Sequence, residues 1–186
     1  MMGLIKAADV RFVRFVPSPP GTQPMSARTV LGIDPGAHGA IAILDETGQL
    51  LELEDMPATV EAGGRISTNA PLLAGILARS HADVVYCEFV AARPTDAKVA
   101  AFSFGRAKGV IEGACGALAL PIIFLTAPTW KRLAEIPPGI ENKDLARTRA
   151  IARWPAHAEL FRRKADIDRA EACLIAVAGL MRAQKL

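Results

Sequence analysis

The sequence predicts an α/β fold in which a five-stranded mixed sheet is flanked by helices. Three short segments in the first third of the chain alternate with the period of a strand, and turn-forming residues join them. Two later apolar segments each follow a stretch with helical spacing, so each returns to the sheet through a helix. The first three strands are therefore expected to form an antiparallel meander, and the last two to be parallel.

The first strand, residues 30–34, ends in an acid, and the chain returns from it as the antiparallel strand 40–44. Alternation places Asp34 on the same face as Gly32, which has no side chain. Pro35 cannot donate a ladder hydrogen bond, so the strand stops there. A carboxylate held at a strand end by a rigid turn suits metal binding; an acid that caps a turn is the alternative.

The remaining elements are predicted from turns, caps and apolar spacing. Asn69 is a suitable N-cap for a short amphipathic helix. Gly105, Gly109 and Gly113 keep one stripe of a long helix flat, which favours close packing on the sheet or against a second subunit. In chain order we expect a strand at 49–55, a polar loop at 56–68, a helix at 69–79, a strand at 83–88, a loop at 89–95, a helix at 96–118, a strand at 120–125, a short helix or turn at 127–133, a helix from Asn142 to about residue 154 and a final helix that opens at 164–168.

Composition limits the class of protein. The 186 residues, 51% of them hydrophobic, suffice for one domain, which we assign to residues 27–186 after a flexible leader at 1–26; Met25 is an alternative natural start. The net charge of +3 permits a nucleic-acid partner without requiring one. Three cysteines without metal-ligand spacing indicate reduced thiols in a cytoplasmic protein, and no apolar run reaches the roughly 18 residues of a membrane span.

Five acids form the pattern with the most chemical content. Glu88 ends the strand at 83–88, and it lies beside Asp34 if the two strands are neighbours. Asp168 and Glu171 share one face of the last helix, whereas Asp166 points elsewhere and is a candidate N-cap. A site of carboxylates alone suits Mg²⁺ or Mn²⁺ rather than zinc. Two such ions about 4 Å apart can promote in-line phosphoryl displacement.

The sequence resembles the RuvC-type Holliday junction resolvases of the ribonuclease H-like superfamily, in particular the versions found in phages and prophages. The similarity extends in order from about residue 29 to 182. It depends on four motifs: residues 31–36, the strand that ends in Glu88, residues 104–109 and residues 168–176. The final acid is Glu171 where bacterial members usually carry Asp, which indicates the phage-like branch.

The resemblance implies a ribonuclease H-like nuclease that acts as a homodimer on four-way DNA junctions and leaves symmetric nicks with 5′-phosphate ends. The helix with Gly105 and Gly109 would supply the dimer interface. Lys131 and Lys143 fall where the family has basic residues near the scissile phosphate. The metal-binding acids would be Asp34, Glu88, Asp168 and Glu171, with Asp166 as an alternative to Asp168.

One departure concerns junction recognition. Bacterial members carry an aromatic residue three positions after the strand-end Glu, where this chain has Ala91. Phe89 or Phe102 could substitute, although we expect a buried core position for each. For Trp130 and Trp154 we expect partial burial in the core rather than stacking on bases. Two alternatives stay open: a broader nuclease for branched DNA or RNA–DNA hybrids, and a non-catalytic nucleic-acid-binding relative. We expect His38, beside the glycine turn, to be a surface residue.

Overall fold

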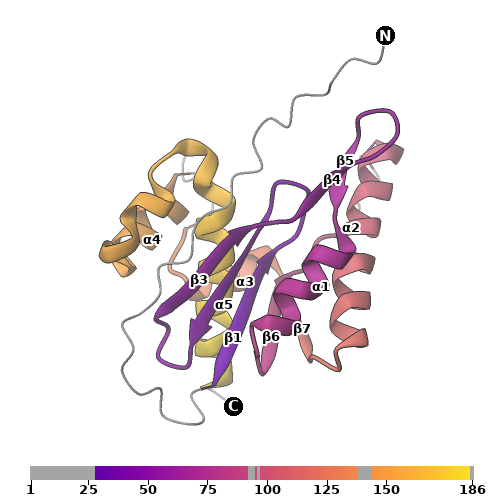
Figure 1. Cartoon of the computed structure of the whole chain (residues 1–186). Coiled ribbons are helices and arrows are strands. Elements are labelled where there is room, and N and C mark those ends of the chain that lie inside the picture. Colours follow the sequence, from indigo (N-terminus) through magenta and orange to yellow (C-terminus); the bar gives the residue numbers. More distant parts are fainter. Residues whose placement is uncertain (1–27, 92–94, 96, 138–143, 185–186) are drawn as a thin grey trace.

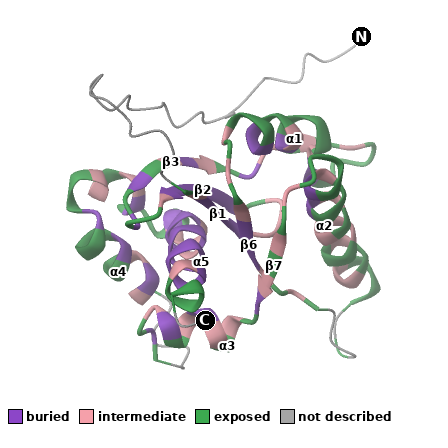
Figure 2. Cartoon of the chain, turned by 90° about the horizontal axis from the view of Figure 1, so that it is seen from below, coloured by how far each residue is buried: buried purple, intermediate pink, exposed green. Residues whose placement is uncertain are grey.

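The computed structural model describes residues 28–91, 95, 97–137 and 144–184. These residues form three layers, with a central sheet, helices α1 and α2 on one face, and helices α3, α4 and α5 on the other (Figures 1 and 2). Each face of the sheet has its own apolar core. The predicted leader at 1–26 lies outside the described residues.

The sheet confirms the predicted fold class. Its strand order is β3-β2-β1-β6-β7, so the first strand in sequence lies at the centre. β1 is antiparallel to β2, and β2 to β3, whereas β6 is parallel to both β1 and β7. The strands are β1 Thr29–Asp34, β2 Ala40–Asp45, β3 Leu50–Asp55, β6 Val84–Glu88 and β7 Ile122–Leu125.

Alternation along β1 divides the two cores as expected. Leu31 and Ile33 are fully buried against α1 and α2, whereas Val30 belongs to the core under α5. Gly32 faces α5 at very close range: a Cβ there would overlap the carbonyl oxygen of Ala172 and lie 2.7 Å from the nitrogen of Ala176. The glycine therefore lets the backbone of α5 lie directly on the central strand.

The helices follow the predicted order. Asn69 caps α1 as expected, because its Oδ1 accepts a hydrogen bond of 3.1 Å from the nitrogen of Leu72. Two short 3₁₀ helices, Pro155–Phe161 and Lys164–Asp166, precede α5. The predicted helix start at Asn142 lies outside the described residues. The helices are α1 Ala70–Arg79, α2 Lys98–Ala117, α3 Ala127–Leu133, α4 Leu145–Arg153 and α5 Ile167–Ala183.

The predicted loop at 56–68 is wrong, because this segment contains a hairpin. β4, Ala58–Val60, pairs antiparallel with β5, Ile66–Thr68, as a separate two-stranded sheet. Gly63 and Gly64 have φ values of 85° and 77° and make the turn. Strands of three residues are too short for an alternation pattern to distinguish them from a polar loop.

Three further expectations are corrected on the side of α2. Apart from the neighbouring backbone of α2 itself, a Cβ added at Gly105, Gly109 or Gly113 would have no heavy atom of the described residues within 4 Å, so this stripe does not pack on the sheet. Phe89 and Phe102 are 42% and 64% exposed rather than buried, because Phe89 follows the end of β6 and Phe102 lies on an outward face of α2. The alternative, that the glycine stripe packs against a second subunit, stays a prediction.

The other burial predictions are confirmed. Trp130 and Trp154 are both in the core under α5, and His38 is exposed. The three cysteines are free and buried, in agreement with the predicted core thiols. Among the residues described, no helix combines the length and apolar character needed to cross a bilayer.

Candidate metal centre

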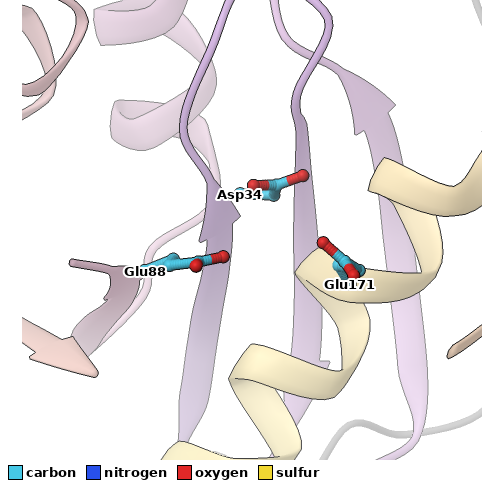
Figure 3. A group of neighbouring side chains, drawn as sticks. All are labelled: Asp34, Glu88 and Glu171. Atoms are coloured by element: carbon cyan, nitrogen blue, oxygen red, sulfur yellow. The ribbon is translucent and has the colours of Figure 1, made fainter. Parts of the chain in front are cut away.

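Three carboxylates from distant parts of the sequence meet at one edge of the sheet. Asp34 ends β1, Glu88 ends the neighbouring strand β6, and Glu171 lies near the start of α5. Each contributes an oxygen atom, and these oxygens all lie within 4.8 Å of one another. Figure 3 shows the three side chains pointing toward a common centre.

The register of the sheet explains this convergence. β1 and β6 are parallel and Ile33 is paired with Cys87, so the next residues, Asp34 and Glu88, leave the sheet side by side. Gly32 allows α5 to pass close over β1, and this approach brings Glu171 to the same edge. Two strand ends and one helix start therefore define the site.

Burial and like charge make the ionised cluster unfavourable without a cation. Burial raises the pKa of Asp34 well above its usual range, and the negative charges of Glu171, Asp168 and Glu88 raise it further. Burial also raises the pKa of Glu88. Burial, together with Glu88 and Asp168, raises the pKa of Glu171 to about 7, against the opposing charge of Lys131.

Lys131 on α3 is a cation that lies beside this cluster. Its Nζ lies 3.8 Å from Oε1 of Glu171, which is a loose ion pair. Its charge lowers the pKa of Asp34 and Glu88 as well, yet the pKa of both acids stays raised. One ammonium group therefore does not balance the three carboxylates. Lys143, the other predicted basic residue, lies outside the described residues.

Asp168 adjoins the cluster without being part of the three-oxygen group. Its negative charge raises the pKa of Asp34 and Glu171, which shows that it lies near both. Burial raises the pKa of Asp168 itself, and the charge of the exposed His38 lowers it. The prediction that His38 lies at the surface is confirmed, and the structure adds that its charge acts on an acid next to the candidate site.

Asp166 occupies a different environment. Its side chain is 1% exposed and accepts hydrogen bonds from the backbone nitrogen of Arg163 at 2.7 Å and from Nη2 of Arg163 at 2.6 Å. Burial alone would raise the pKa of Asp166, but these hydrogen bonds and the charge of Arg163 hold it below its usual value. The structure therefore commits this acid to an ion pair, and the cluster does not include it.

A buried arginine missed at the sequence level connects the start of α5 to the sheet. Nε and Nη2 of Arg169 donate to the two carboxylate oxygens of Asp55, at the end of β3, at 2.6 Å each. Nη1 of Arg169 also lies 3.4 Å from Oδ1 of Asp166. In the sequence, Arg169 directly follows Asp168 at the start of an apolar helix. The spacing of residues gives no indication that its partner is Asp55, which is 114 positions away.

We expect this ion-pair network to stabilise the fold. Replacing Arg169 with Leu leaves the carboxylate of Asp55 without its bidentate partner and removes one partner of the buried Asp166, so the free energy of unfolding should fall by about 2–3 kcal/mol. Urea unfolding measures the change. Arg162→Leu is the matched control, since the side chain of Arg162 is 76% exposed and its ion pair among the described residues is with the surface residue Glu159. Equal loss in both variants would contradict the role given to Arg169.

The raised pKa values predict how stability depends on pH in the metal-free protein. Between about pH 4.5 and 7 the folded state holds a proton on Glu171 that the unfolded chain has lost, so stability should fall as the pH rises through this range. Thermal melts in EDTA from pH 5 to 8 test this. Glu171→Gln should flatten the dependence, whereas Glu159→Gln, at an exposed position, should not. A melting temperature that rises over this range in the unchanged protein would contradict the prediction.

Comparison with known proteins identifies the fold. No sequence-family model and no curated protein sequence matches the chain. The structure of T. thermophilus RuvC in complex with a Holliday junction substrate aligns with a TM-score of 0.55 at 16% identity, covering 85% of this chain and 96% of that one. The chain has the ribonuclease H-like fold of RuvC.

Two further structures are similar. A Thermus thermophilus RuvC structure has a TM-score of 0.53 at 15% identity and covers 84% of this chain and 96% of its own. The yeast mitochondrial Holliday junction resolvase Ydc2 aligns with a TM-score of 0.40 at 12% identity, over 86% of this chain and 81% of its own. The alignments with the two RuvC structures confirm the predicted RuvC-like architecture, and the acids lie at one edge of its central sheet.

Proposed function

We propose that this chain is a metal-dependent endonuclease that cleaves four-way DNA junctions. The convergence of Asp34, Glu88 and Glu171 from β1, β6 and α5 carries this proposal. The RuvC fold supports it, because the aligned structure is of a RuvC protein with a Holliday junction substrate. On this proposal residues 27–186 are one nuclease domain that acts in the cytoplasm.

The cluster has the chemistry of a divalent-cation site. It offers carboxylate oxygens alone, which suit Mg²⁺ or Mn²⁺, and burial of like charges is relieved when a doubly charged ion lies between them. We assign Asp34, Glu88 and Glu171 as ligands, with the adjoining Asp168 as a fourth, for two ions. Asp166 is left out of this set because Arg163 and Arg169 already neutralise it.

The reaction is hydrolysis of a phosphodiester. When bound, two ions supply an activated water and stabilise the leaving oxygen of an in-line displacement. The residues of this chain would hold and orient the ions. The ends of β1 and β6 fix Asp34 and Glu88, while α5 presents Glu171 from the layer that covers this face of the sheet. Lys131, beside Glu171, is placed to neutralise a phosphate oxygen of the bound strand. Lys143 is proposed for the same role.

The substrate is expected to be cut twice. A four-way junction has four strands, which form two symmetry-related pairs, so a homodimer with one cluster in each subunit would leave paired, symmetric nicks with 5′-phosphate ends. The exposed glycine stripe of α2 is a suitable surface for a second copy, since small residues permit close approach of two helices. This assembly is part of the proposal.

Cleavage of synthetic junctions tests the proposal directly. We expect paired nicks at symmetry-related positions of a mobile junction in Mg²⁺ or Mn²⁺, and no cleavage in EDTA. Duplex, Y-shaped and RNA–DNA hybrid substrates are digested in parallel. Equal cleavage of these substrates would establish the broader nuclease instead. If the chain cleaves none of these substrates and calorimetry detects no Mn²⁺ binding, the chain is a non-catalytic nucleic-acid-binding relative instead.

A further inference from the structure

Helix α3 brings two neighbouring side chains to the surroundings of the acid cluster. β7 ends at Leu125, which is paired with Glu88 at the end of β6. α3 begins two residues later and packs against α5, the helix that carries Glu171. Lys131 of α3 lies beside Glu171. The preceding residue, Trp130, lies beside Glu88.

The position of the Trp130 ring is fixed by the fold. Its backbone nitrogen donates a hydrogen bond of 3.1 Å to the carbonyl oxygen of Thr126, and the hydroxyl oxygens of Thr126 and Thr129 share a hydrogen bond of 2.8 Å in the same turn. The indole is fully buried in the core under α5. A large ring in a closely packed core cannot turn freely, so the direction of its N–H is set before any ligand binds.

The indole N–H of Trp130 is a buried donor without a full partner. Its Nε1 is sealed from solvent and makes no hydrogen bond of normal distance and angle to any of the described residues. Burial raises the pKa of Glu88, whereas the charge of Lys131 and the N–H of Trp130 lower it, so this N–H adjoins the Glu88 carboxylate. A buried donor that stops short of its acceptor is unfavourable, and a small movement of Glu88 would complete the hydrogen bond.

The other tryptophan of the chain has its hydrogen bond. Trp154 is also buried under α5, and its Nε1 donates to the carbonyl oxygen of Gly48 at 3.0 Å. An unpartnered indole is therefore not a general feature of this core. It occurs at the tryptophan that adjoins a candidate metal ligand.

We propose that Trp130 is a positioning residue of the metal centre: its indole N–H donates to the carboxylate of Glu88 when that carboxylate binds a divalent cation, and so fixes the orientation of this ligand. Carboxylates that bind metals are usually held by a hydrogen-bond donor behind them. Such hydrogen bonds are often long in the unloaded site and shorten when it is occupied. The inference rests on the proposed function, which supplies the cation.

An indole suits this role because of its charge. It has one donor and no acceptor, so it can only hold the carboxylate and cannot compete with it for the cation. It is also neutral, and therefore does not repel a doubly charged ion as a second lysine beside Lys131 would. The two residues of α3 thus act on different acids, Trp130 on Glu88 and Lys131 on Glu171.

Nuclear magnetic resonance of the indole groups tests the proposal without any need for cleavage. The chain has two tryptophans, so the full chain with isotope-labelled nitrogen gives two indole signals, and Trp154→Phe assigns them. On titration with Mg²⁺, which is diamagnetic, we expect the Trp130 proton to move downfield and to exchange more slowly with water. The Trp154 signal should change little. If calorimetry shows Mg²⁺ binding while the Trp130 signal stays in place, the proposal is wrong.

Substitution tests the same hydrogen bond through metal affinity. Trp130→Phe should weaken binding of Mg²⁺ and Mn²⁺ by roughly tenfold, because Glu88 loses the donor that orients it. Trp154→Phe is the matched control, since it also removes a buried indole, together with the hydrogen bond to Gly48. It should lower the melting temperature and leave metal affinity unchanged. Equal metal affinity in the two variants would contradict the role of Trp130.

An analogue of the same shape separates the N–H from the ring. Benzothienylalanine, incorporated at position 130 by stop-codon suppression, carries sulfur in place of the N–H and fills nearly the same volume. In EDTA this protein should melt like the unchanged chain, because no complete hydrogen bond is lost. Its Mg²⁺ affinity should fall as in Trp130→Phe. Unchanged affinity would mean that Trp130 only fills the core, and would overturn the proposal.

Failure of this proposal differs from failure of the nuclease proposal. Junction cleavage with an unmoved Trp130 signal, or with full metal affinity in the analogue, overturns the positioning role and leaves the nuclease. A shifted Trp130 signal and a tenfold weaker affinity in Trp130→Phe, without cleavage of any DNA, retain the positioning role and overturn the nuclease. If calorimetry detects binding of neither Mg²⁺ nor Mn²⁺, both proposals are wrong.

Discussion

Asp34→Asn is expected to abolish junction cleavage, with a fall of at least about 1,000-fold, or about 4 kcal/mol in activation free energy. The pKa of Asp34 responds to Glu88, Asp168 and Glu171 alike, so this carboxylate is the shared member of the cluster. The asparagine side chain has nearly the same shape as the aspartate side chain, but it lacks the negative charge that binds a divalent ion. The fall in cleavage rate is measured on a labelled four-way junction, before multiple turnovers accumulate.

Junction binding should survive this substitution. Removal of one negative charge reduces repulsion of DNA, so gel-shift affinity in EDTA should be equal or higher, and the metal-free protein should melt at an equal or higher temperature. Asp83→Asn is the matched control, because Asp83 precedes β6 at the opposite end of the strand, where it accepts a hydrogen bond from the nitrogen of Thr29. Normal cleavage by Asp34→Asn would refute the assignment of the acids.

Gly32→Ala is expected to have the second-largest effect, although Gly32 carries no chemistry. The added Cβ would meet backbone atoms of Ala172 and Ala176, which cannot rotate away, so α5 must move off the sheet. We expect a loss of about 3 kcal/mol or more in the free energy of unfolding. Because α5 carries Glu171, Mn²⁺ affinity and cleavage should fall as well, with every acid still present.

Gly75→Ala provides the control for this substitution. Gly75 lies within α1, and apart from the neighbouring backbone of α1 itself no heavy atom of the described residues lies within 4 Å of an added Cβ. Alanine there should therefore be neutral or stabilise the helix by up to about 1 kcal/mol. Urea unfolding and Mn²⁺ calorimetry separate the two variants. If Gly32→Ala unfolds and binds Mn²⁺ like the unchanged protein, the close contact of α5 with β1 does not position the site.

The strand-end acids were predictable because their positions depend on local rules. Alternation along residues 30–34 fixes the face on which Asp34 leaves the sheet, and a helical crossover makes the next strand parallel. Parallel neighbours end at the same edge, so Glu88 lies beside Asp34. The same rules predicted the cap at Asn69 and the antiparallel or parallel direction of the five main strands.

The choice among the acids of the last helix required the fold. Asp166, Asp168 and Glu171 are all near a helix start, where acids are common for local reasons. Only the tertiary contacts show that Arg163 and Arg169 hold Asp166, while Glu171 turns to the cluster. Likewise, exposure of Phe102 depends on which face of α2 meets another element, and helical spacing alone does not specify that face.

The sequence alone determined the directions of the strands, the two acids at the strand ends and the oxygen-only character of the site, because these follow from backbone periodicity and residue type. The tertiary structure decided which acid of α5 joins them, how Arg169 anchors that helix, and that residues 58–68 form a hairpin beside α2. These features depend on side chains far apart in sequence that meet only when the layers pack.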